Sequence, residues 1–250
     1  MKTIAIIPAR YASSRFEGKP LALLNGKPMV MWVYDAVVNS NLFDRVVVAT
    51  DDDRIFNEVF ARGGFAMMTS ESHSCGTQRC EQVLHDLSLK GENYDVAVNV
   101  QGDEPLISKE QLQAILSCFD SEKVEIATLS KLIDNEKDLN DPNVVKVVAS
   151  NGRALYFSRS VIPFTRDISV SQAIKDGVYY KHIGIYAYRS DVLAKIVKLE
   201  KGKLEKLENL EQLRWLENGF EIKIKDTCFE SIGVDTPEDL ERVNELINKK

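Results

Sequence analysis

The sequence alternates between short apolar runs and segments with a helical pattern, and this alternation restricts the fold more than any other feature. Four apolar runs, at residues 4–7, 45–50, 65–68 and 96–100, are each followed by a loop and a predicted helix. Repeated strand–helix units are typical of a parallel sheet covered by helices on both faces. The sequence therefore predicts an α/β fold with a doubly wound, mostly parallel sheet.

The second half of the chain is less regular. Strands are predicted at residues 126–129, 144–148, 153–158, 180–188 and 221–225, and helices at 109–119, 190–199, 207–219 and from 236 to the end. Nothing resembles a linker or an internal repeat. We expect a single domain over residues 1–250, with a subsidiary lobe and mixed sheet extension at about 130–189.

The loop after the first strand is rich in cations. The strand is expected to stop at Pro8, and Arg10, Arg15 and Lys19 follow within a few residues, among small side chains. Such a loop lets backbone N–H groups and cationic side chains approach an anion, and ligands of open α/β sheets bind beyond the carboxyl ends of the strands. The sequence predicts an anion site here, with a solvated basic turn as the alternative.

Composition excludes several classes of partner. The net charge of −6 makes binding of nucleic acid or of an anionic membrane surface unexpected, and no apolar run is long enough for a membrane span. The four cysteines, Cys75, Cys80, Cys118 and Cys228, are scattered without metal-binding spacing. That pattern is typical of reduced thiols, so we expect a cytoplasmic protein.

Two carboxylates occupy similar places in the sequence. Asp103 follows the apolar strand at 96–100, and Asp235 follows the apolar residues 232–234. Hard cations such as Mg²⁺ are usually held by one or two carboxylates together with substrate phosphates. The two residues thus predict a metal site beside the cationic loop. As alternatives, Asp103 caps a helix, or Asp235 or Thr236 caps the last one.

Three further groups have both a functional and a structural interpretation. His182 lies on a predicted strand among tyrosines, where a structural histidine is the more common case. Tyr188 and its neighbouring tyrosines suit a core or interface first and a sugar contact second. Glu211 and Gln212 lie on a predicted helix, where a solvated face is the default.

Many ordered motifs resemble those of one family. They are I-P-A-R-Y-A-S-S-R, N-G-K-P-M, V-A-T-D-D, N-V-Q-G-D-E-P, Y-F-S-R-S-V-I-P, K-H-I-G-I-Y-A-Y-R, L-E-N-L-E-Q-L-R and G-V-D-T-P-E-D-L-E-R-V. Together they resemble the 3-deoxy-manno-octulosonate (Kdo) cytidylyltransferases, or CMP-Kdo synthetases, from residue 4 to residue 243. The resemblance implies a nucleotide-diphospho-sugar transferase fold, a homodimer, and a Mg²⁺-dependent reaction of CTP with Kdo that gives CMP-Kdo and pyrophosphate for lipopolysaccharide assembly.

The resemblance also implies roles for individual residues. The CTP phosphates would be bound by Arg10, Ser14, Arg15 and Lys19, the cytosine would lie near Arg79 and Gln101, and Mg²⁺ would be held by Asp103 and Asp235. The sugar acid would face Arg159, His182, Tyr188, Glu211 and Gln212, with Arg159 as the partner of its carboxylate. Arg10, Arg15, Lys19 and Asp103 are the expected catalytic residues.

The sequence departs from the family pattern at three positions. Gln78 stands where an acidic residue is usual, Cys75 where serine is common, and Glu17 where proline is usual. Gln78 leaves two hypotheses open: the usual acid orients Arg79, or it faces the sugar, in which case 8-amino-Kdo becomes a candidate substrate. A sialic-acid cytidylyltransferase and a nucleotide-binding regulatory protein without turnover are the remaining alternatives.

Overall fold

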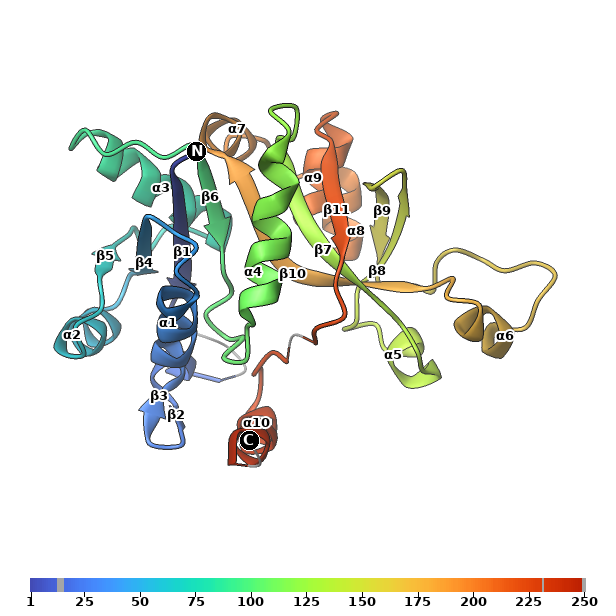
Figure 1. Ribbon diagram of the computed structural model, residues 1–250, viewed down its shortest axis with the longest axis horizontal. Helices are drawn as coiled ribbons and strands as arrows, with labels where there is room; N and C mark the ends of the chain where they lie inside the picture. Colours follow the sequence, from blue (N-terminus) through green and yellow to red (C-terminus); the bar gives the residue numbers. More distant parts are fainter. Residues whose placement is uncertain (13–15, 231, 249–250) are drawn as a thin grey trace. The chain divides into compact units, whose positions relative to one another are not determined.

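The computed structural model describes residues 1–12, 16–230 and 232–248 (Figure 1). The chain forms two compact units, Met1–Gln113 with Ser231–Lys250, and Ala114–Glu230. Residues 130–189, where a lobe is predicted, fall within the second unit. Among the described residues, no helix combines the length and the apolar composition that a bilayer crossing requires.

The first unit is built on four parallel strands in the order β5-β4-β1-β6. The strands are β1 Thr3–Ala9, β4 Arg45–Thr50, β5 Ala66–Met68 and β6 Val96–Asn99, and the helices are α1 Met29–Ser40, α2 Asp53–Ala61, α3 Gly76–Ser88 and α10 Pro237–Asn248. The strands and helices predicted for the first 100 residues are confirmed, with ends that differ by at most two residues.

The strand order changes direction at β1. The chain passes from β1 to β4 and β5 on one side, and then crosses back to β6 on the other side. Because parallel crossovers are almost always right-handed, α1 and α2 cover one face of the sheet and α3 covers the opposite face. The carboxyl ends of β1 and β6 flank this reversal, which is where open α/β sheets bind ligands.

Contrary to the prediction, β1 does not stop at Pro8 but continues to Ala9. Its ladder with β6 ends at Ile6, whose carbonyl accepts a hydrogen bond from the N–H of Val100 at 2.9 Å. Alternate residues of a strand direct their backbone groups to the same side, so the nitrogen of Pro8 points past the end of β6. The missing N–H therefore costs no ladder hydrogen bond.

The connections of the first unit include a 3₁₀ turn at Lys19–Leu21 and a small hairpin of β2 Leu23–Leu24 with β3 Lys27–Pro28. Asp52 caps α2 by accepting from the N–H of Arg54 at 2.9 Å. Thr77 does not cap α3, because the helix begins at Gly76 with Cys75 at the N-cap position. Thr77 is buried inside the first turn.

The second unit contains a mixed sheet in the order β10-β7-β11-β9-β8, in which β7 runs parallel to β11 and antiparallel to β10. Its strands are β7 Ile126–Leu132, β8 Lys146–Ser150, β9 Arg153–Ser158, β10 Tyr180–Arg189 and β11 Ile222–Asp226. The helical elements here are α4 Lys109–Leu116, which begins before the unit boundary, the 3₁₀ helix η2 Ser117–Asp120, α5 Glu136–Asn140, α6 Val170–Lys175, α7 Ser190–Ile196, α8 Lys203–Glu208 and α9 Gln212–Glu217.

Two helix predictions in this half need correction. The helix expected at 207–219 is two helices, α8 and α9, because Asn209 adopts a left-handed conformation with φ of 53° that ends α8. The helix expected at 109–119 changes to a 3₁₀ turn after Leu116. The short helices α5 and α6 had no predicted counterpart.

A small apolar cluster packs the C-terminal segment of the chain into the first unit. Leu24 and Met29 pack with Val234 and Val243, and all four are fully buried. The cluster fixes the segment before α10 against α1 and the β2–β3 hairpin, so a polar side chain on that segment can take part in a site of the first unit.

Candidate active site

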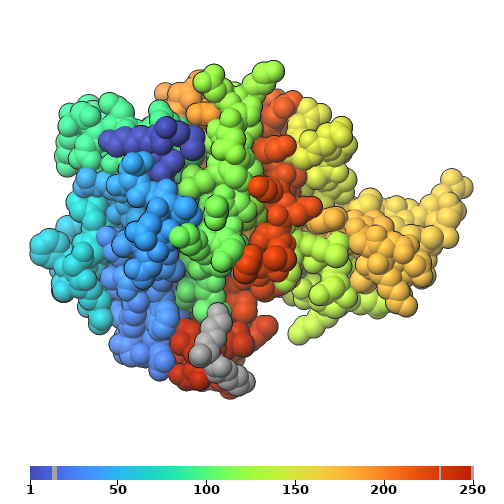
Figure 2. All heavy atoms as spheres, in the orientation of Figure 1, coloured from blue at the N-terminus to red at the C-terminus, as the bar shows by residue number. Residues whose placement is uncertain are grey.

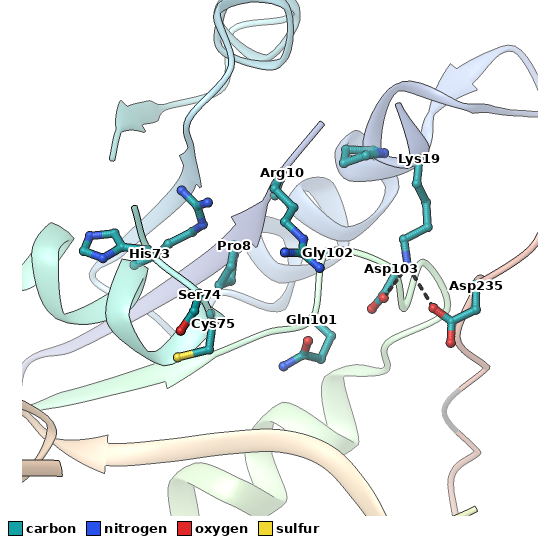
Figure 3. Close-up of a pocket in the computed structure, with 14 residues that line it drawn as sticks. Pro8, Arg10, Lys19, His73, Ser74, Cys75, Gln101, Gly102, Asp103 and Asp235 are labelled. Atoms are coloured by element: carbon teal, nitrogen blue, oxygen red, sulfur yellow. Dashed lines mark hydrogen bonds and ion pairs between the residues drawn. The ribbon is translucent and has the colours of Figure 1, made fainter. Parts of the chain in front are cut away.

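A pocket opens at the carboxyl ends of β1 and β6, where the strand order reverses (Figure 3). Its walls are the end of β1, the loop after β6, the start of α3, the 3₁₀ turn at residue 19 and the segment before α10. The described lining residues are Pro8, Ala9, Arg10, Lys19, Pro20, His73, Ser74, Cys75, Gly76, Arg79, Gln101, Gly102, Asp103 and Asp235. All of them belong to the first unit.

Lys19 joins the two carboxylates that the sequence singled out. Its Nζ donates to Oδ2 of Asp103 at 2.6 Å and to Oδ1 of Asp235 at 3.1 Å (Figure 3). The Lys19 side chain is 14% exposed, against 31% for Asp103 and 44% for Asp235. The three groups come from sequence positions far apart, and their charges compensate one another in a partly solvated cleft.

Local structure fixes the backbone of each member. Gly18 takes a left-handed conformation with φ of 69°, and its N–H donates to the carbonyl of Tyr11 at 2.9 Å, so the turn presents Lys19 to the pocket. Asp103 accepts at its backbone carbonyl from the N–H of Val234 at 2.9 Å. This bond ties the loop after β6 to the segment that carries Asp235.

The cap of α10 resolves the alternative that we left open for Asp235. Thr236 accepts from the N–H of Asp239 at 3.2 Å, while the Asp239 carboxylate accepts from the N–H groups of Asp235 and Thr236 at 3.1 Å. This reciprocal arrangement is a capping box. The helix is therefore capped by Thr236, and the carboxylate of Asp235 faces Lys19 instead.

A second cation, Arg79, is held rigidly in the pocket wall. The residue is only 3% exposed, and its guanidinium pairs with the carboxylate of Asp51 and donates to Oγ1 of Thr69 at 2.8 Å and the carbonyl of Ser70 at 3.2 Å. Asp51 was not among the predicted site residues, so the sequence reasoning missed this partner.

Gln78 does not orient Arg79, which was one of the two hypotheses for this position. Its Oε1 accepts from the N–H of Ser74 at 2.8 Å and from the Ser74 hydroxyl at 3.2 Å. The side chain thus organises the turn that leads into α3. A carboxylate at this position would have the same acceptor atom available for that turn.

Close approach explains a glycine at the pocket floor. A Cβ atom on Gly102 would lie 2.7 Å from the carbonyl oxygen of Pro8, so only glycine lets the loop after β6 pass the end of β1. Arg10 and Gln101 line the pocket on either side of this crossing. His73 and Cys75 also line it but were not predicted, although their place just before a helix at the ligand edge was a usable signal.

The second unit contains a cluster of aromatic side chains around His182. The ring of His182 lies 5.1 Å from Phe157 and 5.2 Å from Tyr186, and Tyr186 and Tyr188 both make edge contacts with Trp215. His182 Nε2 lies 2.9 Å from Oγ1 of Thr128. Burial lowers the pKa of His182 to about 3, so its imidazole is neutral near pH 7.

The other predicted sugar residues of this unit sit near α8 and α9. Arg159 donates through its guanidinium to the carbonyls of Glu208 at 2.8 Å and Pro142 at 2.9 Å. Glu211 accepts from the guanidinium of Arg214 at 2.7 Å, and the neighbouring Gln212 is 5% exposed. Glu211 and Gln212 therefore belong to a structured helix start rather than to a freely solvated face.

The structure thus sorts the predicted site residues into three sets. Arg10, Lys19, Arg79, Gln101, Asp103 and Asp235 line one pocket of the first unit. Arg159, His182, Tyr188, Glu211 and Gln212 belong to the second unit. Ser14 and Arg15 lie outside the described residues. A pocket with three cations and two carboxylates suits a polyanion accompanied by a hard cation.

Comparison with known proteins gives a consistent result. A sequence model of the cytidylyltransferase family matches residues 4–226. The 3-deoxy-manno-octulosonate cytidylyltransferase of Parabacteroides distasonis is 52% identical over 97% of this chain and 96% of its own length. The protein of the same name from Thermodesulfovibrio yellowstonii is 47% identical over 99% of both chains.

Solved structures extend the comparison to the fold. CMP:2-keto-3-deoxy-manno-octonic acid synthetase complexed with CTP has a TM-score of 0.91 and 39% identity, covering 100% of this chain and 99% of that one. The 4-diphosphocytidyl-2C-methyl-D-erythritol synthase of Anaerococcus prevotii, at 15% identity and a TM-score of 0.61 over 99% of both chains, shares the fold alone. The predicted mixed α/β fold of the nucleotide-diphospho-sugar transferase type is confirmed.

Proposed function

The chain belongs to the cytidylyltransferase family, and from this we propose that it transfers the cytidylyl group of CTP to Kdo, giving CMP-Kdo and pyrophosphate for lipopolysaccharide biosynthesis. The observation that carries the proposal is the trio of Lys19, Asp103 and Asp235 at the strand-order reversal, in a pocket that Arg79 and Arg10 also line. The relatives named for this activity support the choice of sugar.

The chemistry is a single in-line displacement at phosphorus. The anomeric hydroxyl oxygen of Kdo forms a bond to the α-phosphorus of CTP, the hydroxyl loses its proton, and the bond to the bridging oxygen breaks to release pyrophosphate. The protein forms no covalent intermediate in this scheme. Its contribution is to position both substrates and to stabilise charge on the phosphate oxygens, for which Arg10 and Lys19 have the right sign and place.

Mg²⁺ is the proposed cofactor. Asp103 and Asp235 fit this ion because both direct carboxylate oxygens at one cation position, which Lys19 marks. Within the described part of the chain, no group of three or more acidic, histidine or cysteine side chains gathers around a common point. Two carboxylates plus substrate phosphates form the usual Mg²⁺ environment in nucleotide enzymes. When bound, the ion would offset negative charge on the phosphates.

The sugar side uses different chemistry. Kdo carries a carboxylate and many hydroxyl groups, so it calls for one cation and several neutral hydrogen-bonding or aromatic groups. Arg159 is the proposed partner of the carboxylate, and His182, Tyr188, Glu211 and Gln212 are the proposed contacts of the hydroxyl-bearing part. The low pKa of His182 supports this, because a neutral imidazole whose Nε2 is engaged with Thr128 keeps Nδ1 for a hydrogen bond with one hydroxyl.

We further propose a cytoplasmic homodimer. The segment that carries α6 projects from the second unit as a gold extension (Figures 1 and 2). It exposes large apolar side chains, among them Phe164 at 87%, Ile168 at 42% and Val170 at 40%. Adjacent exposed apolar side chains are a mark of protein–protein contact. Light scattering of the wild type and Phe164→Asp tests the proposal, and a wild-type monomer at micromolar concentration would contradict it.

The function is tested by pyrophosphate release in the presence of CTP, Mg²⁺ and the sugar acid. We expect release with Kdo, and CMP-Kdo as the product in mass spectrometry. Parallel reactions with 8-amino-Kdo and a sialic acid compare kcat/KM across the related ulosonates. Turnover of either analogue in preference to Kdo would replace the proposed substrate, and CTP binding without turnover of any sugar would indicate a regulatory protein.

A further inference from the structure

The ammonium of Lys19 contacts the same two carboxylate oxygens, of Asp103 and Asp235, that a bound metal ion would need as ligands. It is 2.6 Å from an oxygen of Asp103 and 3.1 Å from an oxygen of Asp235, and the dashed line in Figure 3 runs from Lys19 to Asp235. Mg²⁺ requires oxygens at about 2.0–2.1 Å in an octahedral arrangement. The same two oxygens cannot serve both cations at those distances.

We propose that Lys19 is an exchangeable counter-ion that excludes free metal from this carboxylate pair until a nucleotide arrives. In the absence of nucleotide the ammonium offsets one of the two negative charges of Asp103 and Asp235. A triphosphate offers the ammonium a new anionic partner, and the released carboxylates then accept the metal that accompanies the nucleotide. The inference rests on the proposed function, because it takes the pocket to bind a metal–nucleotide complex.

The geometry allows such an exchange without rearrangement of the backbone. The Lys19 backbone is set by the turn at Gly18 and the short 3₁₀ helix, so the movement is limited to its four-carbon stem. Lysine is a compact charge on a flexible stem, unlike the planar guanidinium of arginine. The 44% exposure of Asp235 leaves its carboxylate open to an incoming ion.

A purely structural role for the bridge explains the site less well. The segment around Asp235 is already fixed by the bond from Val234 to Asp103 and by the buried packing of Val234 and Val243. The capping box at Thr236 adds a third restraint. The carboxylates are therefore held in place without the ammonium, which makes charge compensation the remaining use of the contact.

The inference is tested by Mn²⁺ binding to the nucleotide-free protein. Mn²⁺ prefers the same oxygen ligands as Mg²⁺, and the free ion is counted by electron paramagnetic resonance. We expect Lys19→Met to bind one Mn²⁺ at least tenfold more tightly than the wild type, and Lys19→Met with Asp103→Asn to lose that gain. Lys19→Gln, which keeps a polar group but removes the charge, should behave like Lys19→Met.

Lys27→Met is the matched control. Lys27 pairs with Asp35 at 2.5 Å in the same unit but does not line the pocket, so the variant removes the same charge elsewhere. Its Mn²⁺ affinity should stay within twofold of the wild type. Circular dichroism checks that each variant is folded. If Lys19→Met does not fold, the Mn²⁺ affinity of Lys19→Gln tests the inference instead.

Two results would overturn the inference. The first is equal Mn²⁺ affinity of wild type and both Lys19 variants, and the second is an equal gain in Lys27→Met. Neither depends on turnover, so pyrophosphate release by the wild type is measured alongside. Turnover with unchanged Mn²⁺ affinity would refute the counter-ion role alone, whereas absence of turnover with every sugar would refute the proposed function.

Discussion

The pocket of the first unit and the aromatic cluster of the second differ in whether their titratable side chains are charged or neutral. At the pocket, the ammonium of Lys19 pairs with the carboxylate of Asp103, and the guanidinium of Arg79 pairs with that of Asp51. In the cluster, burial lowers the pKa of His182 to about 3 and raises the pKa of the Tyr186 hydroxyl well above its usual value. Both side chains are therefore neutral near pH 7. One region keeps charges by pairing them, and the other suppresses them by desolvation.

This difference matches what each proposed substrate demands. A triphosphate in transfer gains its stabilisation from fixed cations, which must stay charged over the working pH range. A sugar is recognised specifically through neutral hydrogen bonds and ring contacts. An unpaired charge buried among these groups would be unfavourable without an opposite charge as its partner. Arg159 is the cation among the proposed sugar contacts, and we assign it to the one charged group of the sugar.

The largest effect should come from removing the charge of a carboxylate in the pocket. Asp103→Asn and Asp235→Asn should each keep the fold and lower kcat/KM at least about a hundredfold, because an amide is a weaker ligand for a hard cation and removes one negative charge. Steady-state pyrophosphate release at limiting Mg²⁺ measures the loss. Near-normal turnover in both variants would show that the two carboxylates do not form a catalytic metal site. It would also contradict the role that we give to paired charges in the pocket.

How far the sequence could predict this site depends on whether each feature is local. The buried strands and the polar residues at their ends were predictable, because apolar runs and their stops are local patterns. A strand end also indicated Asp103, since carboxyl ends of parallel strands meet at one edge. For Asp235 the premise was wrong, because the described residues 232–234 before it form no strand. The partner of Arg79 was not predictable, because three consecutive aspartates lie at the junction of β4 and α2, and only the fold shows that Asp51 pairs with the guanidinium.

The same reasoning explains the errors in secondary structure. The amphipathic pattern continues from α8 into α9, and the single left-handed residue Asn209 that separates them leaves no mark on that pattern. Pro8 was expected to stop β1, but whether a proline is tolerated depends on where the neighbouring strand ends, which is tertiary information. The errors therefore had two causes: a single backbone conformation that the apolar pattern does not record, and a tertiary contact.

Loss of the Arg159 charge should affect one substrate alone. We expect Arg159→Met to raise KM for Kdo about tenfold to a hundredfold, which corresponds to the ~1.5–3 kcal/mol of a charge-assisted hydrogen bond. KM for CTP should change less than twofold. Arg166→Met, which removes an exposed guanidinium of the same unit, is the matched control. Equal increases for CTP and Kdo in Arg159→Met would contradict the division of substrates between the two regions.

His182 should make stability depend on pH. Its folded pKa is about 3 and its unfolded pKa about 6.5, so between these values the unfolded state binds more protons. Stability is therefore fully present above pH 6.5 and falls as the pH falls. From pH 7 to pH 5 this contribution amounts to about 2 kcal/mol.

Urea unfolding at both pH values compares wild type with His182→Gln, which cannot titrate. The loss of stability between pH 7 and pH 5 should be about 2 kcal/mol smaller in His182→Gln. His85→Gln, a change at an exposed histidine near the end of α3, provides the control and should keep the wild-type slope. Parallel slopes for wild type and His182→Gln would show that the cluster admits a charged imidazole.

The smallest effect is expected at Gln78, the position where the sequence departs from its family. Its Oε1 accepts from the N–H and hydroxyl of Ser74, and a glutamate can accept at the same place. Arg79 already pairs with Asp51, so a new carboxylate at 78 supplies nothing that the guanidinium lacks. Gln78→Glu should thus leave KM for CTP within about threefold, less than ~1 kcal/mol.

Asp51→Asn removes the charge that does hold Arg79 and should raise KM for CTP about tenfold or more. Steady-state kinetics of both variants with CTP, Kdo and 8-amino-Kdo separates the possibilities. A higher kcat/KM for 8-amino-Kdo in Gln78→Glu would indicate that residue 78 contacts the sugar. A larger change in KM for CTP in Gln78→Glu than in Asp51→Asn would indicate that residue 78, and not Asp51, orients Arg79.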